Sequence, residues 1–202
     1  MTEIINFLVS TIGTLGYFGI FALMFLESSF FPFPSEVVMI PAGYLAFKGD
    51  MNLTLILISG VLGSLAGAWL NYIIALKYGR NLILKIVSNE KLEKLERFFI
   101  DYGNISTFVG RLIPGVRQYI SFPAGLAKMT KITFSIYTML GATIWSVILV
   151  ALGYFLGDNQ ELIHQYLKEI TIGILILAII AIFVYIKLKI INTRGKYEKN
   201  IK

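Results

Sequence analysis

The sequence predicts an all-α polytopic membrane protein, with two opposed re-entrant helical hairpins in an inverted repeat and additional transmembrane helices. The first observation is composition: the 202 residues are 56% hydrophobic and 15% charged, whereas a soluble domain is about 25% charged. The second is that the apolar residues form long uncharged runs. The third is that all five prolines fall in two short segments between these runs.

Four uncharged runs are expected to cross the membrane. About 20 apolar residues span the hydrocarbon core as a helix, and three of the runs are long enough. The fourth is extended by flanking lysines, whose charged ends can reach the interface. The runs are 4–26, 51–76, 132–157 and 170–186. We therefore expect a single membrane domain at 1–190 and a basic cytoplasmic tail at 191–202.

The basic residues set the expected orientation, because cytoplasmic loops are enriched in Lys and Arg. Residues 77–97 and the chain after 187 are rich in both, whereas 158–169 is acidic. This pattern places the first two segments in the cytoplasm and the third outside. With the run 4–26 crossing outward, the N- and C-termini are both cytoplasmic in a multi-pass protein of the cell membrane.

Two proline-containing segments join the runs without having to cross. On this topology, residues 27–47 begin and end outside, and residues 103–128 begin and end inside. Proline breaks helices, and non-helical backbone at membrane depth is tolerated only where protein or a wet cavity surrounds it. We therefore predict one re-entrant hairpin from each face. The breaks are placed at Pro32 and Pro34 in the first hairpin, and at Pro114 and Gly115 in the second.

A weak internal repeat agrees with this topology. "IPAGYLA" at 40–46 resembles "FPAGLAK" at 122–128, and "LGSLAGAW" at 62–69 resembles "LGATIW" at 140–145. The predicted crossings make the two halves inverted relative to each other. Inverted repeats with broken helices that meet near the midplane are typical of many secondary transporters.

Each hairpin carries two ionisable residues, acidic in the first (Glu27 and Glu36) and basic in the second (Arg111 and Arg117). A charge at bilayer depth costs about 2.5–3.5 kcal/mol on insertion scales, so these groups are expected to pair, face water or titrate. Guanidinium groups fork onto phosphate or carboxylate oxygens. The arginines are therefore candidates for binding an anionic headgroup. The acids are expected either to carry protons or only to pair with the arginines.

Residues 88–102 are predicted to form an amphipathic helix on the cytoplasmic surface, with apolar residues on one face and the pairs Glu90–Lys94 and Glu93–Arg97 on the other. Gly60, Gly63 and Gly67 form a stripe that favours close helix packing. Trp69 and Trp145 are either interfacial anchors or packing residues.

These motifs resemble the DedA family, also called the SNARE-associated or VTT-domain family. The resemblance covers about residues 16–157. It lies in "FLESSFFPFPSEVVMIPAG", "FVGRLIPGVRQYISFPAGLAKMTKITF" and "NYIIALKYGR". It implies translocation of undecaprenyl phosphate, the lipid carrier of cell-wall synthesis, with dependence on the proton gradient in some members. The family's embedded acids match Glu27 and Glu36, and its arginines match Arg111 and Arg117.

Other functions stay open beside this one. The same residues suit a proton-coupled transporter of a small ion or solute, a phospholipid scramblase, or a purely structural ion-pair network. A lipid phosphatase commonly uses paired histidines, and the chain has the single His164 and no cysteine. We therefore expect no enzyme activity, cofactor or metal. The expected partners are membrane lipids, including an anionic lipid phosphate. Nucleic acid is not expected, and a homo-oligomer is left open.

Overall fold

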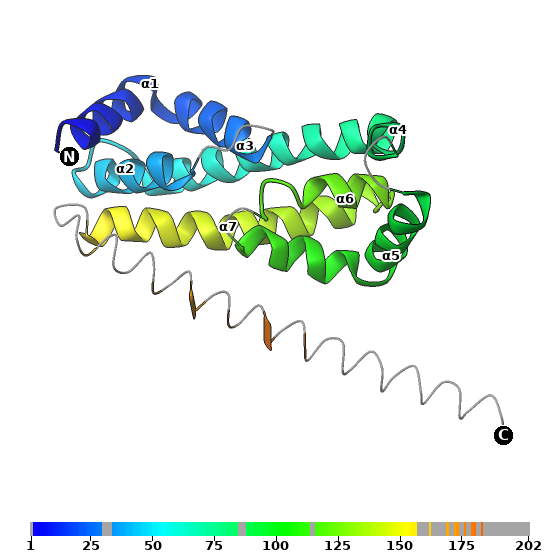
Figure 1. Ribbon diagram of the computed structural model, residues 1–202. Coiled ribbons are helices and arrows are strands. Elements are labelled where there is room, and N and C mark those ends of the chain that lie inside the picture. The colour runs from blue at the N-terminus through cyan, green and yellow to red at the C-terminus, as the bar shows by residue number, and fades with distance from the viewer. Residues whose placement is uncertain are drawn as a thin grey trace.

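The computed structural model describes residues 2–29, 34–84, 88–113 and 116–156, with a few single positions between 162 and 183. Every element in these ranges is a helix (Figure 1). In chain order they are α1 (Thr2–Ser28), α2 (Glu36–Phe47), α3 (Leu53–Ile74), the π-helix η1 (Ala75–Gly79), α4 (Arg80–Ile83), α5 (Asn89–Leu112), α6 (Ser121–Leu126) and α7 (Lys131–Leu156). The predicted span 170–186 falls mostly outside the described residues. His164 and the tail 191–202 fall entirely outside them.

Three helical stretches in the described ranges are long and apolar enough to cross a membrane: Ser10–Ser28, Leu53–Gly79 and Lys131–Phe155. They match three of the four predicted runs, and the chain is an all-α polytopic membrane protein. α2 has 12 residues and is therefore about 18 Å long, too short for a hydrocarbon core of about 30 Å. That length suits a re-entrant arm, and the two re-entrant hairpins stay a prediction.

The first span is bent at Gly16, which Figure 1 shows as an arch in α1. The backbone there has φ 60° and ψ −153°, a region that essentially only glycine occupies. An added Cβ would meet nothing within 4 Å, so the constraint is conformational rather than steric. The uncharged run 4–26 gave no sign of this bend, because its hydropathy is continuous through Gly16.

The packing of the helices repeats between the two halves. α1 packs on α3 as α5 packs on α7, while α2 packs on α7 and α6 on α3. The glycines of the two "PAG" motifs make equivalent contacts. A methyl group on Gly43 would lie 2.3 Å from the Val150 carbonyl oxygen, and one on Gly125 would lie 2.4 Å from that of Tyr72. Each short helix therefore rests directly on the backbone of the long helix from the other half.

α2 and α6 also end in the same way. Gly49 and Lys128 both adopt a left-handed conformation, with φ of 84° and 52°. In both turns the next residue donates its N–H to a helix carbonyl five positions earlier, at 3.0 and 3.1 Å. This bond pattern is the Schellman motif, which satisfies the last carbonyls of a helix. The repeat seen weakly in the sequence is thus present in packing and in capping.

α5 begins at one end of the bundle and then runs along α7 (Figure 1). Its amphipathic start matches the predicted surface helix, with Leu92 and Phe99 buried and Ile100 exposed. Arg80, the first residue of α4, holds this start through an ion pair of 2.9 Å with Glu96. The predicted amphipathic helix and the first arm of the second predicted hairpin are therefore one continuous helix.

Candidate charged site between the two hairpins

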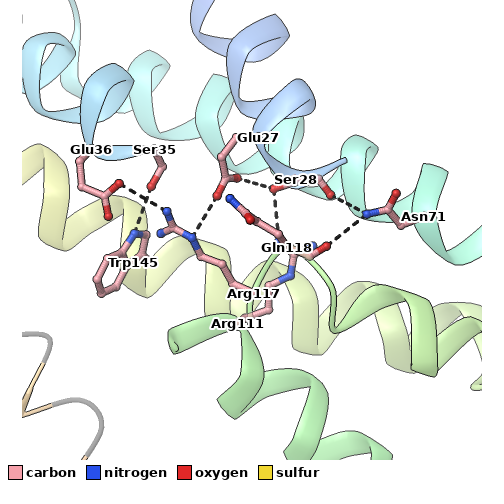
Figure 2. A network of polar contacts seen from close by, with 9 residues as sticks. All are labelled: Glu27, Ser28, Ser35, Glu36, Asn71, Arg111, Arg117, Gln118 and Trp145. Atoms are coloured by element: carbon pink, nitrogen blue, oxygen red, sulfur yellow. Dashed lines mark hydrogen bonds and ion pairs between the residues drawn. The ribbon is translucent and has the colours of Figure 1, made fainter. Parts of the chain in front are cut away.

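The structure brings the four predicted charged residues together at the centre of the described bundle (Figure 2). Glu27 lies in the last turn of α1, and Glu36 is the first residue of α2. Arg111 lies in the last turn of α5, and Arg117 lies in the turn that follows it. The acids therefore come from the ends of helices at the first break and the arginines from both sides of the second.

Arg117 pairs with both acids. Its Nε is 3.0 Å from Oε1 of Glu27, and its Nη2 is 3.5 Å from Oε2 of Glu36. The closer pair is not aligned as a hydrogen bond, since neither atom has a hydrogen-bond partner among the described residues. Arg117 Nη1 is also without such a partner. The guanidinium of Arg117 therefore has donors without a hydrogen-bond partner among the described residues, although it lies beside two carboxylates.

Arg111 reaches the acids only through Ser28. Its Nη1 donates to Ser28 Oγ at 3.3 Å, and Ser28 Oγ donates to Oε2 of Glu27 at 2.7 Å. Arg111 Nε and Nη2 have no hydrogen-bond partner in the described part of the chain. The buried Arg111 guanidinium thus has two adjacent N–H donors that no described residue binds.

These groups are almost completely removed from solvent. Glu27, Arg111 and Arg117 are 2%, 3% and 6% exposed, whereas the Glu36 side chain is 27% exposed. With all four ionised, the two acids balance the two arginines. Neutrality offsets part of the desolvation cost, but breaking a buried pair leaves an uncompensated charge and costs about 3–5 kcal/mol. An anionic ligand placed beside these four groups would therefore need a compensating change in their charge.

Trp145 of α7 closes one side of the site. The Arg117 guanidinium carbon lies 5.1 Å from the centroid of its ring, within the range of a cation–π interaction. The indole N–H donates to Ser35 Oγ at 3.2 Å. Ser35 immediately precedes α2, so one indole contacts residues of both hairpins.

Asn71 of α3 connects the two predicted hairpin segments on the other side of the site (Figure 2). Its Nδ2 lies 3.2 and 3.1 Å from the carbonyl oxygens of Ser28 and Ser29, and 3.2 Å from that of Gln118. The carbonyls of Ser28 and Ser29 lie at the end of α1, and that of Gln118 lies in the turn before α6. Regular helix bonds end at such positions. The amide therefore satisfies backbone groups that the two chain breaks leave open.

A small cavity lies beside the charges, with about 10 Å³ open to the centre of a water-sized sphere. That is room for about one water molecule. Its lining joins the ionised groups to serines and apolar side chains of α1, α3 and α7. The lining residues are Met24, Glu27, Ser35, Ser64, Arg111, Arg117, Ala142, Trp145 and Ser146. The cavity is therefore small, and both arginines lie at its wall.

The predicted helix breaks are only partly described. Pro34 is exposed and lies two residues before the start of α2, and its carbonyl accepts the N–H of Val37 at 3.2 Å. Pro32, Pro114 and Gly115 lie outside the described residues. The side chains that the sequence analysis did not assign to the site are Ser28, Ser35 and Trp145. No sequence signal marks a serine as a bridge, and the sequence left Trp145 as either an interfacial anchor or a packing residue; the structure buries it at 4% exposure.

The helices and the buried charges define the class: a polytopic membrane protein with a central site of two acids and two arginines. The VTT domain model matches residues 33–155, more than half of the chain. The chain belongs to this family, the DedA family.

Several curated relatives cover nearly the whole chain. The "Alkaline phosphatase-like protein" of Lactococcus lactis is 32% identical, over 99% of each chain. "Undecaprenyl phosphate transporter A" of Bacillus subtilis is 30% identical, over 94% of this chain and 96% of its own. "Protein DedA" of Escherichia coli is 28% identical, over 86% and 83%. No solved structure matches the chain significantly. The relatives therefore support a membrane transporter at the level of the family.

Proposed function

We propose that the protein translocates undecaprenyl phosphate, or a closely related polyprenyl phosphate, across the cytoplasmic membrane and is coupled to protons. The observation that carries the proposal is Arg111, a buried cation at the wall of a central cavity, with two donors that have no partner among the described residues. Support also comes from the Bacillus subtilis relative named for this substrate. The headgroup would leave chemically unchanged, so the activity is transport and not catalysis.

The chemistry of the site suits a phosphate monoester. Such a headgroup carries about −1.5 to −2 charges at neutral pH and offers three acceptor oxygens. Arg111 Nε and Nη2 would donate to it as a fork, and Arg117 Nη1 would add a third donor. The polyprenyl chain would stay in the bilayer beside the apolar helices. The headgroup would thus replace the carboxylates as partner of the arginines.

Charge balance supplies the reason for proton coupling. The resting site is neutral with two ionised acids and two arginines, and a divalent headgroup would make it negative. Protonation of Glu27 and Glu36 would restore neutrality in a region where an unbalanced charge is costly. Release of these protons would then favour release of the lipid. The expected orientation, with both termini in the cytoplasm and one hairpin from each face, is part of the same proposal.

The test is a flipping assay with purified protein in vesicles that contain undecaprenyl phosphate. An added phosphatase that cannot enter the vesicle removes phosphate only from the outer leaflet, so hydrolysis beyond that fraction measures translocation. Loss of hydrogen bonds to a charged group costs about 1.5–3 kcal/mol. Arg111→Ala should therefore slow translocation by about 10- to 100-fold. The matched control is Arg80→Ala, which removes an exposed guanidinium paired with Glu96.

Three outcomes separate the alternatives. A wild-type rate equal to that of empty vesicles contradicts lipid phosphate transport and favours a small ion or solute as substrate. Equal movement of a labelled phosphatidylcholine indicates a scramblase. If Arg111→Ala translocates lipid at the wild-type rate, the proposed role of the arginine is contradicted.

Proton coupling is tested by the dependence of translocation on a pH gradient. Loss of this dependence in Glu27→Gln would support proton coupling, and an unchanged dependence in both Glu27→Gln and Glu36→Gln would contradict it.

A further inference from the structure

We propose that Trp145 is a positioning residue of the transport site: it holds Arg117 in the orientation that a lipid phosphate requires. This proposal rests on the proposed function and adds a residue to it. Trp145 is 4% exposed, lines the central cavity and contacts residues of both hairpins. It touches the cation rather than the cavity's occupant, so its effect passes through Arg117.

Arg117 needs such a support because of its place in the chain. It lies in the turn between α5 and α6 and not within either helix, and its long side chain carries about 2 kcal/mol of rotamer entropy. Two carboxylates hold its Nε and Nη2. The indole ring of Trp145 lies against the guanidinium of Arg117. Among the described residues, Nη1 of Arg117 has no hydrogen-bond partner. When a phosphate replaces the two carboxylates as the partner of Arg117, the contact between the Trp145 ring and the guanidinium remains.

The hydrogen bond of the indole fixes the ring itself. Its N–H donates to Ser35 Oγ at 3.2 Å, directly before α2, which carries Glu36 as its first residue. The ring position is thereby tied to the start of the helix that supplies one of the two acids. Trp145 therefore couples the placement of Arg117 to the placement of α2.

The other tryptophan of the chain provides a matched comparison. Trp69 ends the corresponding motif of the first half, and its indole N–H also donates to a serine, Ser135 Oγ, at 3.1 Å. Its ring contacts are aromatic, however, with centroids 5.3 Å from Tyr72 and 6.0 Å from Phe134. The two residues thus share a fold position and a hydrogen-bond type. Trp145 differs in lying beside a cation.

The contact can be tested by fluorescence, because the chain has two tryptophans. In the full-length Trp69→Phe protein in detergent, Trp145 is the only source of tryptophan emission. Arg117→Gln on this background should shift or brighten the emission, because it removes the cation beside the ring. Arg80→Gln should leave the emission unchanged. Equal spectra for all three proteins would overturn the contact, whether or not the protein transports lipid.

The role is tested by the kinetics of the flipping assay. A cation–π contact is worth about 0.5–1 kcal/mol or more, so Trp145→Phe should raise the apparent KM for undecaprenyl phosphate by about two- to fivefold or more. Trp69→Phe should leave KM unchanged. Equal KM changes in both variants would overturn the proposal. If Trp145→Phe loses thermal stability, Ser35→Ala takes its place, and an unchanged KM in that variant counts against the proposal.

Failure of this proposal can be told apart from failure of the proposed function. A wild-type protein that moves no lipid phosphate removes the function, while the emission spectra still decide whether Trp145 senses Arg117. Transport by the wild type with equal KM in both tryptophan variants removes only the positioning role.

A titration with dodecyl phosphate in detergent adds a direct readout of phosphate binding. Phosphate binding should change Trp145 emission in the Trp69→Phe protein, and dodecyl sulfonate of the same chain length is the comparison for headgroup charge.

Discussion

Glu27 is the residue on which the charged site depends. It lies within 3.0 Å of Arg117 Nε and accepts a hydrogen bond from Ser28, which in turn accepts one from Arg111. One carboxylate therefore contacts one arginine directly and the other through a hydroxyl. A substitution of Glu27 therefore alters the contacts of both arginines. Among the described contacts, a substitution of the more exposed Glu36 alters that of Arg117.

Removal of one partner of the buried pair should be more harmful than removal of both. Glu27→Gln or Arg117→Gln leaves an uncompensated charge, and each should lower the free energy of unfolding by about 3–5 kcal/mol. The double variant leaves no charge of that pair, so its loss should be clearly smaller than the sum. A double-mutant cycle from chemical unfolding in detergent measures this coupling. Additive losses would show that the two groups do not depend on each other.

The charged residues of the site could be predicted from the sequence, but their partners could not. Four charges in apolar segments must be compensated, and that argument led to Glu27, Glu36, Arg111 and Arg117. Which arginine pairs with which acid depends on the course of the chain after each helix break. The bridge from Arg111 to Glu27 through Ser28 depends on the rotamer of the serine, and no sequence pattern predicts that rotamer.

At the scale of elements, the spans were predictable because hydropathy alone determines them. Residues 51–76 and 132–157 correspond to α3 with η1 and to α7. The bend at Gly16 and the π-helix at Ala75–Gly79 were not, because both are changes of backbone geometry within continuous apolar sequence. A π-helical turn often marks a functional position, and here it joins α3 to α4.

The contact between α2 and α7 should be intolerant of any side chain at its glycines. A methyl group on Gly153 would lie 2.0 Å from the Ile40 carbonyl oxygen, so the two backbones must separate. Overpacking typically costs about 1–3 kcal/mol. Gly153→Ala should therefore lower the midpoint of thermal unfolding in detergent. Gly13→Ala is the control, because its methyl group would meet only Leu45 at an ordinary 3.8 Å.

An unchanged or raised midpoint in Gly153→Ala would contradict the close approach of α2 and α7. For Gly13→Ala the expectation is opposite, because alanine is favoured over glycine inside a helix by about 0.5–1 kcal/mol. The two substitutions are chemically identical, so a difference between them reports the local packing.

At the scale of the whole molecule, the short helices α2 and α6 each pack against the opposite half of the sequence. α2 contacts α7, and α6 contacts α3, while Asn71 bonds to carbonyls on both sides of the site. Neither half of the sequence therefore encloses the site alone. This exchange of partners was beyond the sequence analysis, because a repeat shows which segments correspond and not which segments touch.

The inverted topology can be mapped directly, since the chain contains no cysteine. Single cysteines at Asp50, Lys94 and Thr130 lie at exposed positions between or on the helices. A thiol reagent that does not cross membranes should label Asp50→Cys in intact cells. It should label Lys94→Cys and Thr130→Cys only after the membrane is opened. Labelling of Asp50 and Lys94 from the same side, or of Lys94 and Thr130 from opposite sides, would contradict the predicted crossings.

The exchanged packing of α2 and α7 also has a consequence for biosynthesis. The ribosome makes Glu27 and Glu36 long before it makes Arg117 and the backbone of α7 on which α2 rests. During that interval the first hairpin has neither its cation nor its packing surface, and buried acids without partners are costly in a membrane. We therefore expect the predicted first hairpin to stay at the aqueous interface until α7 has entered the membrane. Assembly of the site would then be a late event that depends on the complete chain.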